Sequence, residues 1–98
     1  MIKVFYDRAS EDIFNGLDAS VARKVCPKEL WHIARRKLDQ INRVTQIKDL
    51  LIPPGNRLER LKGDRLGQVS VRINDQYRIC FSWEDGNAFR VEITDYHK

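Results

Sequence analysis

The clearest hydrophobic pattern lies before the middle of the chain, where apolar residues recur every three or four positions. Pro27 precedes the stretch, and the apolar positions are Leu30, Ile33, Ala34, Leu38, Ile41 and Val44. This spacing matches one face of an α-helix, and proline is tolerated in the first helical turn because its missing N–H has no partner there. The pattern predicts a helix over residues 27–44 and one further turn over residues 46–50. The polar side, interpreted as the solvent-exposed face, includes Arg35, Arg36 and Lys37.

The segment before this helix carries a second, shorter helical signal. Residues 1–6 are β-branched and aromatic, and they predict an opening strand. Asp7 can cap a short helix over residues 8–15, and Gly16 can end it. Residues 17–25 fit either a loop or a weak helix.

The last third of the chain changes to the period of two that is typical of strands. Residues 53–56, Pro-Pro-Gly-Asn, break the helical pattern because neither proline donates a backbone hydrogen bond. Asp85-Gly86 indicates a tight hairpin turn, which requires positive φ at both central positions. Alternation predicts strands over residues 58–61, 69–73, 78–83 and 88–94, with a charged turn over residues 62–65.

The order of these elements favours a single α+β domain over residues 1–98. We expect an N-terminal strand, two helices, and then a mainly antiparallel sheet of three to four strands, with the helices on one face. Val69, Val71 and Ile73 alternate with Arg72. If the three apolar side chains face the helices, Arg72 lies on the opposite, open face of the sheet.

Composition and charge narrow the range of partners only slightly. The 98 residues carry a net charge of +4 with a pI near 9.3, which suits nucleic acid or an acidic protein but is also common in soluble proteins without such partners. Cys26 and Cys80 lack the spacing of a metal site or a redox pair, and Cys80 is expected to be a buried thiol. No apolar segment reaches membrane-spanning length and the N-terminus lacks a signal-peptide core, so we expect a cytoplasmic protein without membrane contact.

Two arginines on neighbouring strands are the first candidates for chemistry. Arg72 and Arg78 flank the polar turn of a predicted hairpin. A guanidinium is always charged and its donors match the oxygens of a phosphate, so the two side chains could converge on one phosphodiester. The alternative is that each simply pairs with an acidic residue on the sheet surface: Asp75, Glu84 or Glu92.

Titratable and aromatic side chains also gather at the C-terminus, as Asp95, Tyr96 and His97. Histidine changes charge near neutral pH and is the natural proton carrier, although a terminal histidine is also common on an inert surface. Lys62 and Arg65 form a basic turn that either is simply solvated or steers phosphate. Two histidines and two cysteines without local spacing give no metal site, and no glycine-rich nucleotide loop is present, so no cofactor is expected.

Several of these motifs, in this order and spacing, closely resemble the HigB-type branch of the RelE/ParE toxin superfamily. They are Pro-Pro-Gly-Asn-Arg-Leu from residue 53, Leu-Lys-Gly-Asp-Arg from residue 61, Gly-Gln at 67–68, residues 71–81 and Asp-Tyr-His at 95–97. The resemblance implies a RelE-like α+β fold and a toxin that cleaves mRNA on the translating ribosome. It also implies a neighbouring helix-turn-helix antitoxin of the HigA type, through which alone the toxin would contact operator DNA.

The resemblance also assigns roles to residues. Catalysis would fall to Lys62, Arg72, Asp95, Tyr96 and His97, and binding of RNA and its phosphates to Arg57, Arg65, Tyr77 and Arg78. His97 would be general acid or base, with Asp95 or Lys62 as its counterpart, while Arg72 stabilises phosphoryl charge. Where relatives commonly carry an aromatic after Gly-Gln, this chain has Val69, so base stacking would fall to Tyr96 or Tyr77.

Two alternatives remain open on the sequence. The ParE branch of the same fold poisons DNA gyrase without catalysis, and fold alone does not separate the two activities. The Asp-Tyr-His ending favours cleavage, since a gyrase binder needs no proton carrier there. The other alternative is an attenuated toxin that acts chiefly as an antitoxin-binding co-repressor.

Overall fold

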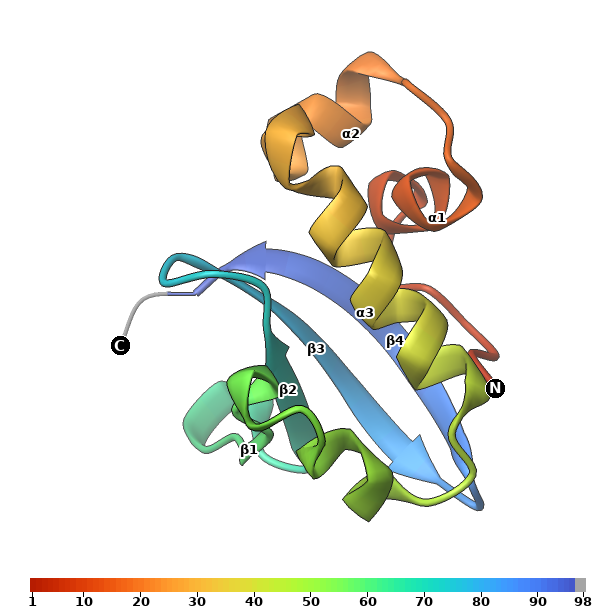
Figure 1. The fold of residues 1–98 in the computed structure, drawn as a ribbon, viewed down its shortest axis with the longest axis vertical. Helices are drawn as coiled ribbons and strands as arrows, with labels where there is room; N and C mark the ends of the chain where they lie inside the picture. The colour runs from red at the N-terminus through yellow and green to blue at the C-terminus, as the bar shows by residue number, and fades with distance from the viewer. Residues whose placement is uncertain (97–98) are drawn as a thin grey trace.

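Helices cover one face of a four-stranded antiparallel sheet in the computed structural model, which describes residues 1–96 (Figure 1). The helices are α1 (Arg8–Asn15), α2 (Ser20–Val25) and α3 (Trp31–Arg43). The strands, which lie in the sheet in chain order, are β1 (Glu59–Arg60), β2 (Gln68–Arg72), β3 (Tyr77–Glu84) and β4 (Asn87–Asp95). The α+β class and the antiparallel sheet predicted from the sequence are confirmed.

The first helix begins and ends at the expected residues. The Asp7 side chain accepts a hydrogen bond of 2.8 Å from the Ser10 N–H and so satisfies one of the free donors of the first turn. Gly16 follows α1 in the left-handed conformation, with φ of 76°, and its N–H bonds back to the helix.

The remaining helical prediction is correct in position but differs in detail. The stretch predicted as one helix over residues 27–44 begins with a 3₁₀ turn, Lys28–Leu30, and continues as α3. Val44 leaves the helix with an extended backbone, and Ile47–Leu51 forms a second 3₁₀ turn. Of the two interpretations of residues 17–25, the weak helix is correct, since α2 lies there.

The predicted N-terminal strand is wrong as a regular element. The segment runs beside β4 but forms only two isolated parallel bridges, at Ile2 with Ala88 and at Phe5 with Val91. Between the two bridges β4 is irregular, since Arg90 has φ of 55° and the register with β3 shifts by one residue. The bridges are three residues apart on both segments, from Ile2 to Phe5 and from Ala88 to Val91, and they do not join into a continuous ladder.

The sheet and α3 enclose the hydrophobic core. Val69 faces Phe81 and Val71 faces Ile79 across β2 and β3, and all four belong to the buried cluster that also contains Leu38 and Ile41 of α3. The β3–β4 turn has positive φ at Asp85 (52°) and Gly86 (79°), as the hairpin prediction requires. At the outer edge of the sheet, the Ile93 N–H of β4 donates a hydrogen bond of 3.0 Å to the buried Ser10 Oγ.

Asn56 fixes the segment between α3 and the sheet. Its side chain is fully buried, and its amide nitrogen donates to the Leu50 carbonyl at 3.1 Å and to Gln40 Oε1 at 3.0 Å. The amide oxygen accepts a hydrogen bond from the Lys37 ammonium. The Pro-Pro-Gly-Asn break is therefore tied to α3 through side chains. None of the helices within residues 1–96 is both long and apolar enough to cross a bilayer.

Candidate functional site

Arg72 and Arg78 are direct cross-strand partners at the end of β2 and β3 that leads to the polar turn. Successive side chains of a strand point to opposite faces of the sheet. Val71, next to Arg72, and Ile79, next to Arg78, belong to the core, so both arginines lie on the face opposite the helices. The expected position of Arg72 on that face is confirmed. Its side chain is 30% exposed and pairs with Asp75, a carboxylate that is itself 100% exposed. The hydrogen bond from Arg72 lowers the pKa of Asp75.

Arg78 is held inside the protein. It is only 8% exposed, its Nε donates 2.7 Å to Ser70 Oγ, and its Nη2 donates to the Arg57 carbonyl. The two arginine side chains therefore do not converge on one open phosphate position. The other alternative was a pairing with Asp75, Glu84 or Glu92, and the side-chain bonds that hold Arg78 go instead to Ser70 and to the Arg57 carbonyl. Arg78 thus fixes the chain at Arg57, which has φ of 45°.

Basic side chains from α3 join this end of the sheet. Lys37, which bonds to Asn56, is close enough to Arg72 and Arg36 for their charges to interact, and burial followed by these charges lowers the pKa of Lys37. Arg57, next to Asn56, is exposed, and its charge also acts on Asp75. Sequence reasoning placed Arg36 and Lys37 on an inert solvent-exposed face. Their spacing from Gln40 could have indicated a shared surface: Arg36 lies four residues and Lys37 three residues before Gln40, on neighbouring helical positions. Gln40 also binds Asn56.

The basic turn between β1 and β2 lies at the other end of β2. The Leu61 N–H bonds to the Gln68 carbonyl, so the exposed Lys62 follows directly at the Gln68 end of the strand. Gln68 and Arg72 are four residues apart, roughly 13 Å along a strand. The backbone at Lys62 is therefore not adjacent to Arg72.

Arg65 extends from that turn across the same face of the sheet. Its Nη1 lies 3.1 Å from both Gln68 Oε1 and Glu92 Oε1. Burial opposes the charge of Arg65, but its hydrogen bond to the Glu92 carboxylate and nearby negative charge outweigh burial and raise the pKa of Arg65. Glu92 is the cross-strand partner of Cys80, which is fully buried although it alternates with the core residues. The face opposite the helices is thus partly covered.

The C-terminal residues that the structure describes divide between the two faces of the sheet. Asp95 pairs across strands with Tyr77, and the Gln76 amide donates 3.0 Å to its carboxylate. Tyr77 packs against the core, and burial, then the charge of Asp95, raises the pKa of Tyr77. The next residue, Tyr96, is half-buried, its N–H donates a hydrogen bond of 2.8 Å to the Gln76 carbonyl, and it lies close enough to Arg65 for an electrostatic interaction. His97, the predicted proton carrier, lies outside the described residues.

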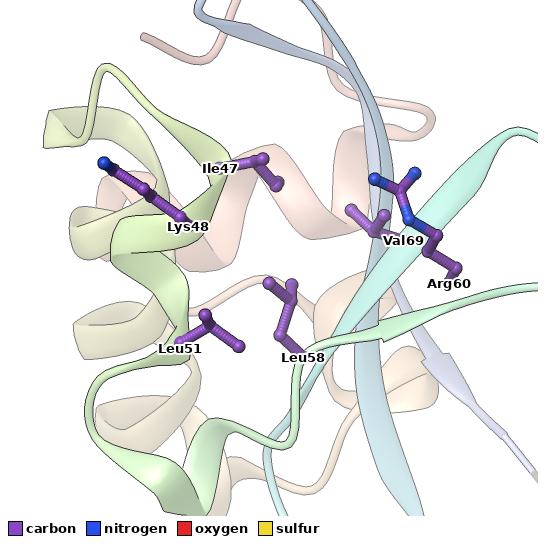
Figure 2. A pocket seen from close by; sticks show the side chains of 6 residues that line it. All are labelled: Ile47, Lys48, Leu51, Leu58, Arg60 and Val69. Atoms are coloured by element: carbon purple, nitrogen blue, oxygen red, sulfur yellow. The ribbon is translucent and has the colours of Figure 1, made fainter.

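A largely apolar pocket of about 310 Å³ lies at the β1 edge of the sheet, where Arg60 contributes to its lining but Arg72 and Arg78 do not. Figure 2 shows Ile47 and Leu51 from the 3₁₀ turn pointing towards Leu58 and Val69, while the Lys48 ammonium points outwards. Val69 is only 7% exposed. It lies on the core side of the sheet, so its position offers no stacking surface on the face that carries Arg72.

The described residues show no metal chemistry and no activated thiol. Within residues 1–96, no three His, Cys, Asp or Glu side chains come close enough together to hold a metal ion. Burial raises the pKa of Cys26 and of Cys80 to about 11 each, so both thiols stay protonated at neutral pH. The buried thiol predicted at Cys80 is confirmed.

Comparison with known proteins gives consistent matches over nearly the whole chain. A family model described as the RelE-like toxin of the type II toxin-antitoxin system HigB matches residues 3–97. Toxin HigB-1 of Vibrio cholerae is 40% identical over 75 residues, which cover 76% of this chain and 78% of that protein. Endoribonuclease HigB of Proteus vulgaris is 32% identical over 101 residues, covering 99% and 100%.

A solved structure agrees at the level of the fold. The chain is similar, with a TM-score of 0.53 and 15% identity, to a chain in the heterotetrameric YoeB–YefM toxin–antitoxin complex from Staphylococcus aureus. The similarity covers 100% of this chain and 99% of the other. At this identity the comparison supports the RelE-like fold alone.

Proposed function

Because the chain belongs to the HigB-like family of RelE-like type II toxins, we propose that it is an endoribonuclease that cleaves mRNA on the ribosome. Cleavage would inhibit translation and growth. The observation that carries the proposal is the match, along the whole chain, to a relative named Endoribonuclease HigB. The gathering of the cations Arg72, Arg57 and Lys37 at one end of the sheet supports the proposal, because a phosphate would bind there.

The proposed reaction needs no metal and no water nucleophile. A base removes the proton of a ribose 2′-OH, whose oxygen attacks the adjacent phosphorus. A cyclic phosphate forms as the bond to the 5′-oxygen breaks, and an acid protonates this leaving oxygen. His97 takes one of the two proton-transfer roles, and Asp95 or Lys62 the other. Each such group contributes typically ~10²–10⁴ in rate.

Arg72 is the residue assigned to the developing charge on the phosphoryl oxygens. Its partner, Asp75, is fully exposed, and surface ion pairs of this kind are weak because water screens them. A phosphate can therefore displace Asp75 at little cost. Arg78 serves by positioning, since its bond to the Arg57 carbonyl holds Arg57 beside the same phosphate. Arg65, bonded to Glu92, is placed to hold a more distant part of the RNA.

The base next to the cleaved bond requires an aromatic partner. Tyr96 is half-buried and shares the side of the sheet on which Arg65 lies, so we assign stacking to Tyr96. Tyr77 packs against the core and is the second choice. The ribosome then supplies alignment of the 2′-OH, and orientation of this kind provides roughly 7–11 kcal/mol.

The proposed partners follow from the family. As a type II toxin the protein pairs with an antitoxin, which we propose to be a helix-turn-helix protein of the HigA type that alone contacts operator DNA. The ribosome and its mRNA are the other partners. The toxin would act in the cytoplasm, as one domain over residues 1–98 and without membrane contact.

Induced expression with mapping of mRNA 5′ ends tests the activity. The wild type should produce cuts linked to codons in translated mRNA. Arg72→Ala should reduce cleavage by roughly 10²–10³, as for the loss of one transition-state donor, and His97→Ala by ~10²–10⁴. Cleavage of one purified mRNA with and without ribosomes tests ribosome dependence.

Arg23→Ala is the matched control, because Arg23 also forms an exposed ion pair, 2.7 Å from Asp18, but lies on α2. It should cleave like the wild type. DNA damage with intact mRNA would support a gyrase poison instead. Full cleavage by both Arg72→Ala and His97→Ala would rule out the assigned site, and normal growth without antitoxin would indicate an attenuated toxin.

A further inference from the structure

A second basic hollow lies on α3, on the side of the helix that faces the Pro-Pro-Gly-Asn segment. It has a volume of about 260 Å³ and is lined by Arg36, Lys37, Gln40, Arg43 and Pro53. Three of these five side chains are cations. Residues 36, 40 and 43 share one helical stripe, so they present their side chains to the same space.

Hydrogen bonds hold the two walls of the hollow together. Gln40 Nε2 donates 2.6 Å to the Ile52 carbonyl, directly before Pro53, and Gln40 Oε1 accepts from the buried Asn56. The Lys37 ammonium bonds to the other end of the Asn56 amide. The hollow is thus built on fixed side chains and does not depend on the chance position of surface residues.

Among the residues that the structure describes, the cations of the hollow have no carboxylate partner. Asp39 is the one acidic residue of α3, and within residues 1–96 no carboxylate forms an ion pair with Arg36, Lys37 or Arg43. The Arg43 guanidinium makes one backbone bond, 3.3 Å to the Asp39 carbonyl, which leaves most of its donors available. Like charges held together in this way are stabilised by an anion.

The hollow also continues the surface that carries Arg72. Lys37 interacts electrostatically with Arg36 on one side and with Arg72 on the other. Asn56, which binds Lys37, is followed in the chain by Arg57. The cations therefore form a path from β2 across Lys37 to the second half of α3.

We propose that the α3 hollow binds a phosphodiester of RNA, separate from the phosphate at Arg72. This inference rests on the proposed function for the identity of the polyanion. Guanidinium groups suit phosphate oxygens, and Gln40 offers no negative charge that would oppose them. The phosphate belongs either to the cleaved strand or to a structured RNA beside it.

The salt dependence of RNA binding tests the proposal without requiring cleavage. The probes are a short fluorescent 2′-O-methyl oligouridylate, which lacks the attacking hydroxyl, and a labelled 2′-O-methyl RNA hairpin. Arg36→Gln/Arg43→Gln is compared with Arg23→Gln/Lys24→Gln, which removes the same charge from α2, at the far end of the molecule from β1 (Figure 1). Each lost phosphate contact should reduce the slope of log K against log salt by about 0.7.

We expect the α3 variant, which loses the one phosphate contact of the hollow, to have a slope shallower by about 0.7, with the α2 variant unchanged. A change with the oligouridylate assigns the hollow to the cleaved strand, whereas a change with the hairpin alone assigns it to structured RNA. Equal slopes for both variants with both probes would overturn the proposal. Arg36→Gln and Arg43→Gln, made singly, provide the same readout if the double variant is unstable.

The readout also separates the two proposals from each other. Changed slopes in a protein whose wild type produces no mRNA cuts would leave the hollow in place and remove the nuclease assignment. Unchanged slopes in a protein that does cleave mRNA would keep the nuclease assignment and remove the hollow as a phosphate-binding site.

Discussion

Arg72 and Arg78 show how one residue type serves two purposes within a single cross-strand pair. Arg72 keeps its guanidinium at the surface with a loosely held carboxylate, while Arg78 uses the same group to bind Ser70 and the Arg57 carbonyl inside the protein. Their alternation with apolar residues predicts the face they share. It does not predict the difference, because burial of Arg78 depends on a carbonyl that lies 21 positions away in the chain.

Asn56 is the residue on which the basic surface most depends. Asn56→Ala removes the buried bonds to Leu50, Gln40 and Lys37 and leaves their groups unsatisfied. Each buried group left unpaired costs about 1–3 kcal/mol, so the free energy of unfolding should fall by at least that amount. Urea denaturation measures the change, and Asn15→Ala, at an exposed position, should stay within about 0.5 kcal/mol of the wild type. A stable Asn56→Ala protein would contradict the structural role assigned to this amide.

The two buried thiols give a prediction about pH. Burial raises the pKa of Cys26 and Cys80 to about 11, so between about pH 9 and 11 the unfolded chain loses these protons while the folded chain keeps them. The unfolded state then binds fewer protons, and the free energy of unfolding should fall as pH rises through this range. Urea titrations from pH 8 to 11 should show a weaker decline for Cys80→Ala than for the wild type. Parallel declines would show that Cys80 does not carry the effect.

Among the elements, the β3–β4 hairpin makes the strictest demand on sequence. Gly86 has φ of 79°, and an added Cβ would lie 3.2 Å from the Thr45 carbonyl oxygen. Gly86→Ala should therefore cost about 1–2 kcal/mol of stability from the left-handed backbone alone. Gly55→Ala is the control, since Gly55 has ordinary φ and open space around it, and it should be neutral or stabilising by about 0.4–1 kcal/mol. Equal effects of the two changes in urea denaturation would refute this reading of the turn.

Elements whose signals are local could be predicted from the sequence. The Asp7 cap, the Gly16 stop and the Asp85-Gly86 turn each depend on a few adjacent residues, and all three lie where expected. The N-terminal strand could not be judged in the same way. Its residues do lie along β4, but whether two bridges become a ladder depends on the local geometry of both segments, and β4 is irregular at Arg90 between the bridges.

At the scale of the whole molecule, the sequence predicts the position of Arg72 better than it predicts which cations surround Arg72. Arg72 was expected on its face of the sheet from alternation alone. The gathering of Arg57, Lys37 and Arg36 beside it could not be predicted, because it depends on Asn56 joining α3 to a loop 16 to 19 residues later. Conversely, Lys62 and Arg72 are joined in the sequence motif but lie at opposite ends of β2. The linear order of a motif thus does not specify which of its residues lie close together in the fold.

The unpaired cations along α3 also bear on how fast the protein finds a polyanion. Arg36, Lys37 and Arg43 lie together with Arg57 and Arg72 at one side of a molecule of net charge +4. Such an uneven distribution gives the protein an electric dipole moment, which would turn this side towards a polyanion before any atoms touch. Encounters so guided are faster by roughly 10–10³ at low ionic strength and lose that gain as salt rises. The charges of α3 therefore act on the rate of capture as well as on the strength of the complex.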